Sequence, residues 1–87
     1  MVAILKVTLG LGNVSRVAHF RIPDSDQVHV VGSGIYQMAR EQGMWSRCHL
    51  LPSDVQLSEL VIHEVSAEKM IEIVSECRRL LNQQIAA

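Results

Sequence analysis

The chain has few aromatic residues and few cysteines, and each shortage narrows the class of protein that it can be. Phe20, Tyr36 and Trp45 are its only aromatic residues, so Val, Ile, Leu and Met must build most of a hydrophobic core. Its two cysteines, Cys48 and Cys77, form no C-x-x-C pair, which argues against a structural zinc site and against a secreted disulfide framework. We therefore expect a reduced, cytoplasmic protein, and we predict no cofactor.

A run of charge of one sign is also lacking. The formal net charge is −1, with acidic and basic side chains interspersed, and this does not indicate a nucleic-acid-binding arm or a membrane anchor. The apolar stretch 1–12 is interrupted by Lys6 and is too short to cross a bilayer, so we expect a strand there and no membrane association. A chain of 87 residues predicts one domain, 1–87, and so small a core favours self-association.

The clearest local pattern is the pair Gly12-Asn13 between two apolar runs, which is typical of a tight β-hairpin because Gly adopts positive φ. With Leu11 opposite Val14, the register follows along both strands. One face is then almost entirely apolar, and a slip of one residue would exchange the two faces. The sequence thus predicts two antiparallel strands over 3–22 in a defined register.

Two structures compete for the next segment. Either Asp24 or Ser25 begins one long helix that ends near Gln42, or 27–31 is a third strand, followed by a short helix over 33–42. We prefer the strand, because β-branched residues are dense there and each Gly inside a helix costs roughly 1 kcal/mol relative to Ala. In the preferred interpretation the chain begins with a β-meander.

The remaining elements complete an α+β fold. Residues 59–65 predict a strand, and 46–51 could form another short one. Ser66 begins the best-defined element, a helix to about Gln84 whose apolar positions recur at helical spacing. Those positions are Met70, Ile73, Val74, Cys77, Leu80 and Leu81. We predict a two-layer sandwich: an antiparallel sheet of four to five strands with two helices on one face.

The glycine turn Gly32-Ser33-Gly34 resembles a phosphate-binding loop only superficially. A dinucleotide fingerprint requires a third glycine at position 37, where this chain has Gln37. It also requires a parallel strand after the helix. We therefore interpret these glycines as a turn between a strand and a helix.

The histidines are weak candidates for a metal site or for catalysis. The meander would set His19 across from His29, with His63 or a carboxylate as a possible third ligand, but no H-x-H or H-x-x-x-H spacing supports metal binding. Cys48 and His49 are adjacent, so on a strand they point to opposite faces and cannot act as nucleophile and base. We predict no metal site, no catalytic residue and no enzymatic activity.

The sheet face away from the helices is the most informative surface, because a solvated face should be polar and this one contains aliphatic residues. The candidate interface consists of Val2, Ile4, Val17 and Val31. We predict a non-enzymatic interaction module that forms a homodimer or binds a partner protein through this face. The plainer interpretation is that such residues are simply good strand formers.

The alternative function is binding of a small ligand, a metal or nucleic acid through His19, Arg21 and His29 on the same face. Nucleic acid is disfavoured for two reasons. The expected face holds no aromatic residue for stacking, and the net charge is slightly negative.

Overall fold

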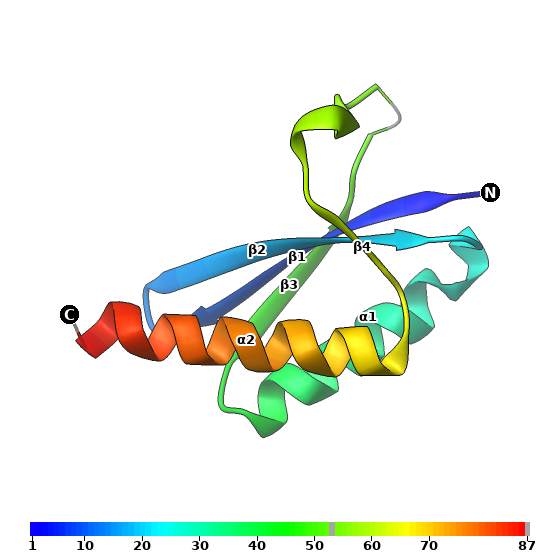
Figure 1. Cartoon of the computed structure of the whole chain (residues 1–87). Coiled ribbons are helices and arrows are strands. Elements are labelled where there is room, and N and C mark those ends of the chain that lie inside the picture. Colours follow the sequence, from blue (N-terminus) through cyan, green and yellow to red (C-terminus); the bar gives the residue numbers. More distant parts are fainter. Residues whose placement is uncertain (53, 87) are drawn as a thin grey trace.

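The hairpin predicted around Gly12 is the centre of the sheet (Figure 1). The computed structural model describes residues 1–52 and 54–86. Strands β1 (Ala3–Leu11) and β2 (Val14–Ile22) pair antiparallel from Leu11 opposite Val14 to Ala3 opposite Ile22. Gly12 has φ +57°, the left-handed conformation that the tight turn requires. The predicted register is confirmed along the whole hairpin.

The sheet has four strands in the order β3-β1-β2-β4 and is mixed. Strand β3 (Trp45–Leu50) pairs antiparallel with β1, and the short β4 (Ile62–Glu64) pairs parallel with β2. The expectation of a purely antiparallel sheet is therefore wrong. The segment that contains a 3-10 turn, η2 (Leu57–Glu59), carries the chain from one sheet edge to the other, so β4 enters in the direction of β2.

The meander is also wrong, because 28–41 is a single helix, α1 (Val28–Glu41). The Asp24 side chain accepts a hydrogen bond from the Asp26 backbone N–H at 3.0 Å and starts a 3-10 turn, η1 (Ser25–Gln27), that leads into the helix. Val31, Ile35 and Ala39 are buried at helical spacing. Burial of this stripe against the sheet outweighs the local preference for a strand, and the competing one-helix interpretation was correct.

Gly34 also has a packing role inside α1. A Cβ atom built at this position would lie 3.3 Å from Cε of Met70, a residue of the second helix, α2 (Ala67–Ala86). The missing side chain therefore allows the two helices to approach each other closely.

Helix α2 follows the prediction closely. The Ser66 Oγ accepts a hydrogen bond from the Lys69 backbone N–H at 3.0 Å, as an N-cap residue does. Four of the predicted stripe residues are buried: Met70, Val74, Cys77 and Leu81. The other two, Ile73 and Leu80, are half-buried at the margin of the core.

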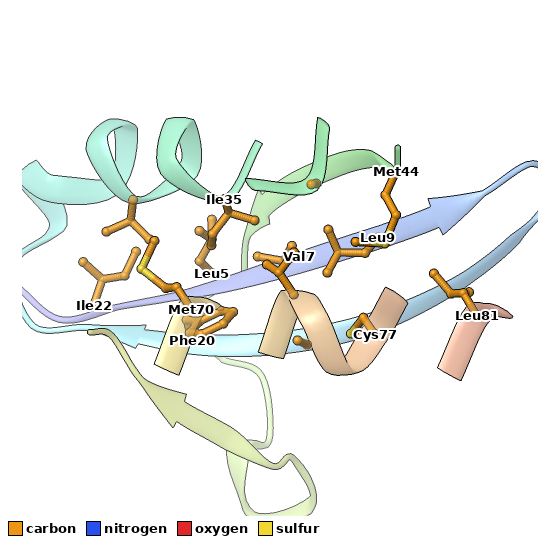
Figure 2. Packing of buried hydrophobic residues seen from close by; sticks show 14 residues of the cluster. Leu5, Val7, Leu9, Phe20, Ile22, Ile35, Met44, Met70, Cys77 and Leu81 are labelled. Carbon is orange, nitrogen blue, oxygen red and sulfur yellow. The ribbon is translucent and has the colours of Figure 1, made fainter. Parts of the chain in front are cut away.

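Both helices cover the same face of the sheet, and the core lies between them and the central strands (Figure 2). Leu5, Val7 and Leu9 from β1 and Phe20 and Ile22 from β2 are each at most 2% exposed. The helical stripes close over these side chains. The opposite face of the sheet carries no α-helix, and the segment with the 3-10 turn η2 projects from that side (Figure 1).

Neither helix in the described part of the chain is long and apolar enough to cross a membrane.

Two glycine substitutions test this architecture in opposite directions. A Cβ at Gly10 would lie 2.1 Å from a ring carbon of Trp45, whereas a Cβ at Gly32, inside α1, would meet nothing within 4 Å. We expect Gly10→Ala to lower the free energy of unfolding by about 1–3 kcal/mol because the indole must move. Gly32→Ala should raise it by about 0.5–1 kcal/mol, because Ala is the better helix former.

Urea denaturation of the two variants and the parent chain measures both effects. Equal stability of Gly10→Ala and the parent would contradict the packing of Trp45 on Gly10. A destabilised Gly32→Ala would contradict the helical conformation of 28–41.

Candidate binding face of the sheet

The uncovered face of the sheet, here called the open face, is defined by the alternation of side chains along the strands. Because Leu5, Val7 and Leu9 point to the helices, the residues between them on β1 point away. The pairing extends this face across the neighbouring strands. The members of the open face are Ile4, Lys6, Thr8, Gly10, Ser15, Val17, His19, Arg21, Trp45, Arg47, His49, Ile62 and Glu64.

Trp45 is the aromatic residue of this face, and its position is set by its neighbours. It lies opposite Gly10, whose missing side chain leaves room for the indole. The indole Nε1–H donates a hydrogen bond to the backbone carbonyl of Gly12 at 2.9 Å, so the ring is fixed to the hairpin turn. The guanidinium of Arg47 lies 5.4 Å from the ring centroid, within cation–π range. Trp45 is 37% exposed.

Three cations cross the open face along a diagonal. Arg47 pairs with Thr8, two residues from Lys6 on β1, and Arg21 pairs with Ile4, two residues beyond Lys6. Each step therefore moves one strand sideways and two residues along, a spacing of about 7–8 Å between neighbours. The line Arg47–Lys6–Arg21 forms a continuous cationic track.

The open face differs in charge from the rest of the molecule. Among its strand members, all of them described, the one acidic side chain is that of Glu64, which lies 3.6 Å from Arg21 in an exposed ion pair of little energetic weight. The same face carries the three basic residues of the track. The whole chain has 8 basic and 9 acidic side chains, so five basic and eight acidic ones lie elsewhere. The net charge near zero is thus the sum of a positive charge on the open face and a negative charge on the rest of the chain.

Histidines flank the centre of the track. Lys6 pairs with His49 on one side and with His19 on the other. Burial, together with the positive charges of Lys6 and His63, lowers the pKa of the His19 imidazole. His63 itself packs against Phe20, with ring centroids 5.7 Å apart, at the edge of the helix-covered face. His19 is therefore neutral at pH 7.

An apolar groove of about 400 Å³ lies at the Arg21 end of the track. Val2, Ile4 and Ile62 form its floor together with Arg21. Residues of the segment after β3, Leu51, Pro52, Val55 and Leu57, form its wall. The open face thus carries an aromatic ring at one end and an apolar recess at the other.

The structure brings together only part of the predicted interface. Ile4 and Val17 lie on the open face, Val17 48% exposed, and Val2, 53% exposed, lines the groove. Val31 is on α1 and 7% exposed, so its expected position on the open face is wrong. The reason is that its segment forms a helix whose apolar stripe packs on the opposite face.

His29 is likewise separated from His19 and Arg21. It lies on α1 and lines a second groove, of about 520 Å³, between α1 and the outer edge of β3. The expected cross-strand pair of His19 and His29 is therefore wrong. Within residues 1–52 and 54–86, no group of three or more His, Cys, Asp or Glu side chains is placed to hold a metal ion.

Gly32-Ser33-Gly34 lies inside α1, several residues from the N-terminus of the helix. The backbone N–H groups in this part of a helix bond to the preceding turn and are not free to hold a phosphate. The interpretation of these glycines as a turn is wrong as well.

Sequence reasoning missed Trp45, Arg47 and His49 as members of the open face. A possible strand over 46–51 was visible, but its partner and register were not. The signal that could have found them is the alternation of Trp45, Arg47 and His49 with small or apolar residues. The glycine at position 10 also marks a place where a large side chain can pack.

No protein-family model, curated protein or solved structure that was compared with the chain matches it.

The environment of His19 predicts a pH dependence of stability. Because the pKa of His19 is lower in the folded protein than in the unfolded chain, folding favours the neutral imidazole. Its contribution to the free energy of unfolding is fully present at pH values above the ordinary pKa of histidine. That stability is lost as the pH falls through the lower, folded value. We expect the free energy of unfolding to fall from about pH 7.5 to about pH 5, and to fall less in His19→Gln.

Urea denaturation at both pH values measures this difference. NMR titration of the imidazole in Lys6→Met separates the causes, because loss of the cation should move the pKa of His19 upward. An identical titration in Lys6→Met would contradict the contribution of Lys6, and an identical pH dependence in His19→Gln would contradict the role of His19.

Proposed function

We propose that the chain is a non-enzymatic binding module whose open face binds single-stranded nucleic acid. The observation that carries this proposal is the cationic track Arg47–Lys6–Arg21, which has Trp45 beside its first member. A row of cations follows a phosphate backbone, and a partly exposed indole offers a surface on which a base can stack. From the sequence, nucleic acid was disfavoured because the expected face held no aromatic residue and the net charge is slightly negative. The open face contains Trp45 and the three cations of the track, although the net charge of the chain is −1.

Single-stranded nucleic acid fits this face better than a duplex does. Bases of a single strand can be turned toward a protein surface and stacked on aromatic or imidazole rings, whereas those of a duplex are already stacked on one another. Here Trp45, His49 and His19 lie among the cations, and the apolar groove beside Arg21 has room for a further base. A sheet face of several strands allows backbone and bases to be contacted together.

Self-association through the same face is opposed by its charge. A symmetric pair of open faces would set Lys6, Arg21 and Arg47 against the same residues of a second copy. Glu64 alone could neutralise them, and it already pairs with Arg21. A homodimer, which we retain as part of the proposal, therefore uses another surface.

The absence of catalysis is also part of the proposal. Burial raises the pKa of the Cys48 thiol and, as the largest cause, that of Cys77, so both thiols are poor nucleophiles at neutral pH. Both cysteines are free. A cytoplasmic location, where thiols stay reduced, is part of the same proposal.

Trp45 provides a direct measurement, because it is the only tryptophan in the chain. We expect its fluorescence to be quenched when an oligouridylate or oligothymidylate of about twelve nucleotides binds. Affinity measured by fluorescence anisotropy should fall with salt, with a slope near −2 for a track that contacts about three phosphates. Lys6→Glu and Arg47→Glu should each weaken binding and flatten this slope by about 0.7 or more. Trp45→Leu should weaken binding by roughly 5- to 150-fold.

Arg40→Glu is the matched control, because it makes the same change of charge at an exposed position on α1, outside the open face. It should leave the salt slope unchanged. Equal loss of affinity in Arg40→Glu and Lys6→Glu would contradict binding at the open face. Binding of polyglutamate as tight as that of the oligonucleotides, with the same response of Trp45, would instead assign the face to an acidic protein partner.

A further inference from the structure

The outer edge of β3 is an unpaired strand edge, and this observation is independent of the open face. The backbone N–H of Leu51 donates to the carbonyl of Ile4 at 2.9 Å. Because hydrogen-bonded positions alternate along an antiparallel pair, Trp45, Arg47 and His49 also direct their backbone groups toward β1. The N–H and C=O groups of Ser46, Cys48 and Leu50 therefore point outward. Within the described residues no backbone hydrogen bond satisfies them.

β3 lacks most of the features that protect an edge from pairing. Its one charged side chain, that of Arg47, points to the open face and lies over the Trp45 ring, 5.4 Å from the centroid. Proteins commonly block an exposed edge with a proline, a bulge, a lysine that points toward the core side, or a very short strand. The other edge strand, β4, has only 3 residues. β3 has 6 residues without a proline, and it pairs with β1 without interruption. Its side chains on the helix side, those of Ser46, Cys48 and Leu50, are uncharged.

The surface beside this edge suits an uncharged, partly apolar neighbour. The groove between β3 and α1 is lined by Tyr36, Ser33 and His29 from the helix and by Cys48 and Leu50 from the strand, among others. None of its lining residues is Asp, Glu, Lys or Arg. Leu50 is 54% exposed and Tyr36 is 51% exposed. Close approach of another molecule would bury these side chains and bring no ionised group out of water.

We propose that β3 pairs antiparallel with β3 of a second copy, so that two chains form one continuous eight-stranded sheet. A two-fold axis perpendicular to the sheet keeps both open faces on the same side. The two side chains of every pair across the new ladder then point to the same face, so the axis must pass through a residue and not between two residues. An axis at Cys48 sets Ser46 opposite Leu50 of the second copy and allows about six backbone hydrogen bonds. An axis at Arg47 would set that residue against itself and allow about four.

The Cys48-centred register is self-complementary in charge as well. It sets Arg47 opposite His49 of the second copy, so no pair of like permanent charges faces across the new ladder. This is why a second copy fits the edge better than an unrelated strand. The same chain that repels itself across the open face pairs with itself along β3.

Sedimentation equilibrium of the full chain at micromolar concentration tests the proposal. We expect a dimer, and we expect Leu50→Lys, which adds a charge at an exposed edge position, to shift it to monomer. Val30→Lys is the matched control, because Val30 is 66% exposed on α1 and does not line the groove. Circular dichroism of both variants verifies that the fold persists. A monomeric parent chain, or a Leu50→Lys variant that dimerises as well as Val30→Lys, overturns the proposal.

Cross-linking tests the register. With Cys77→Ala, prolonged reaction with the shortest bis-maleimide at mildly alkaline pH, where more of the thiol is ionised, should join Cys48 to Cys48 of the second copy, whose Cα atoms would lie about 5.5 Å apart. With Ser46→Cys in a chain that also carries Cys48→Ala and Cys77→Ala, the two thiols would lie on residues about 13 Å apart, and cross-linking should fail. Efficient cross-linking at position 46 but not at 48 overturns the Cys48-centred register. Oligonucleotide binding by the parent chain, which the open face provides whether or not β3 pairs, distinguishes failure of this proposal from failure of the proposed function.

Discussion

The alternation of side chains along the β1–β2 hairpin is the constraint on which the rest of this structure depends. Leu5, Val7 and Leu9 on β1 all face the helices, and the residues between them all face away. A slip of one residue would exchange the core with the open face. Both helices bind to the apolar side because only that side offers them a surface on which to bury their stripes. The polar side is left uncovered and basic.

The contact of Trp45 with Gly10 links this hairpin to the proposed function. It positions the first residue of β3 against the end of β1 and holds the indole at the hairpin turn through Gly12. Arg47 is then placed in line with Lys6 and Arg21. A residue that stabilises the sheet is thus also the residue proposed to stack on a base, so a substitution of Trp45 affects both. Fold stability and binding must therefore be measured together.

The two proposed partners are assigned to surfaces that differ in charge. The open face is basic and repels its own copy, so it suits a polyanion. The edge of β3 and the adjoining groove hold no ionised residue on the helix side, so they suit a second chain. If β3 pairs as proposed, the two open faces join on one side of the extended sheet. Their cationic tracks would then lie on a single surface long enough for a longer strand of nucleic acid.

The sequence by itself determined the elements whose stabilising contacts are local. The hairpin register follows from Gly12-Asn13 and a strict alternation, and α2 follows from Ser66 and a stripe of regular spacing. Only the tertiary structure decided the state of 28–41, because its local preference for a strand is outweighed by burial of Val31, Ile35 and Ala39. The open face could not be predicted in full for the same reason. Trp45 and Arg47 reach it through pairing of β3 with β1, and which strands pair depends on contacts between residues far apart in the chain.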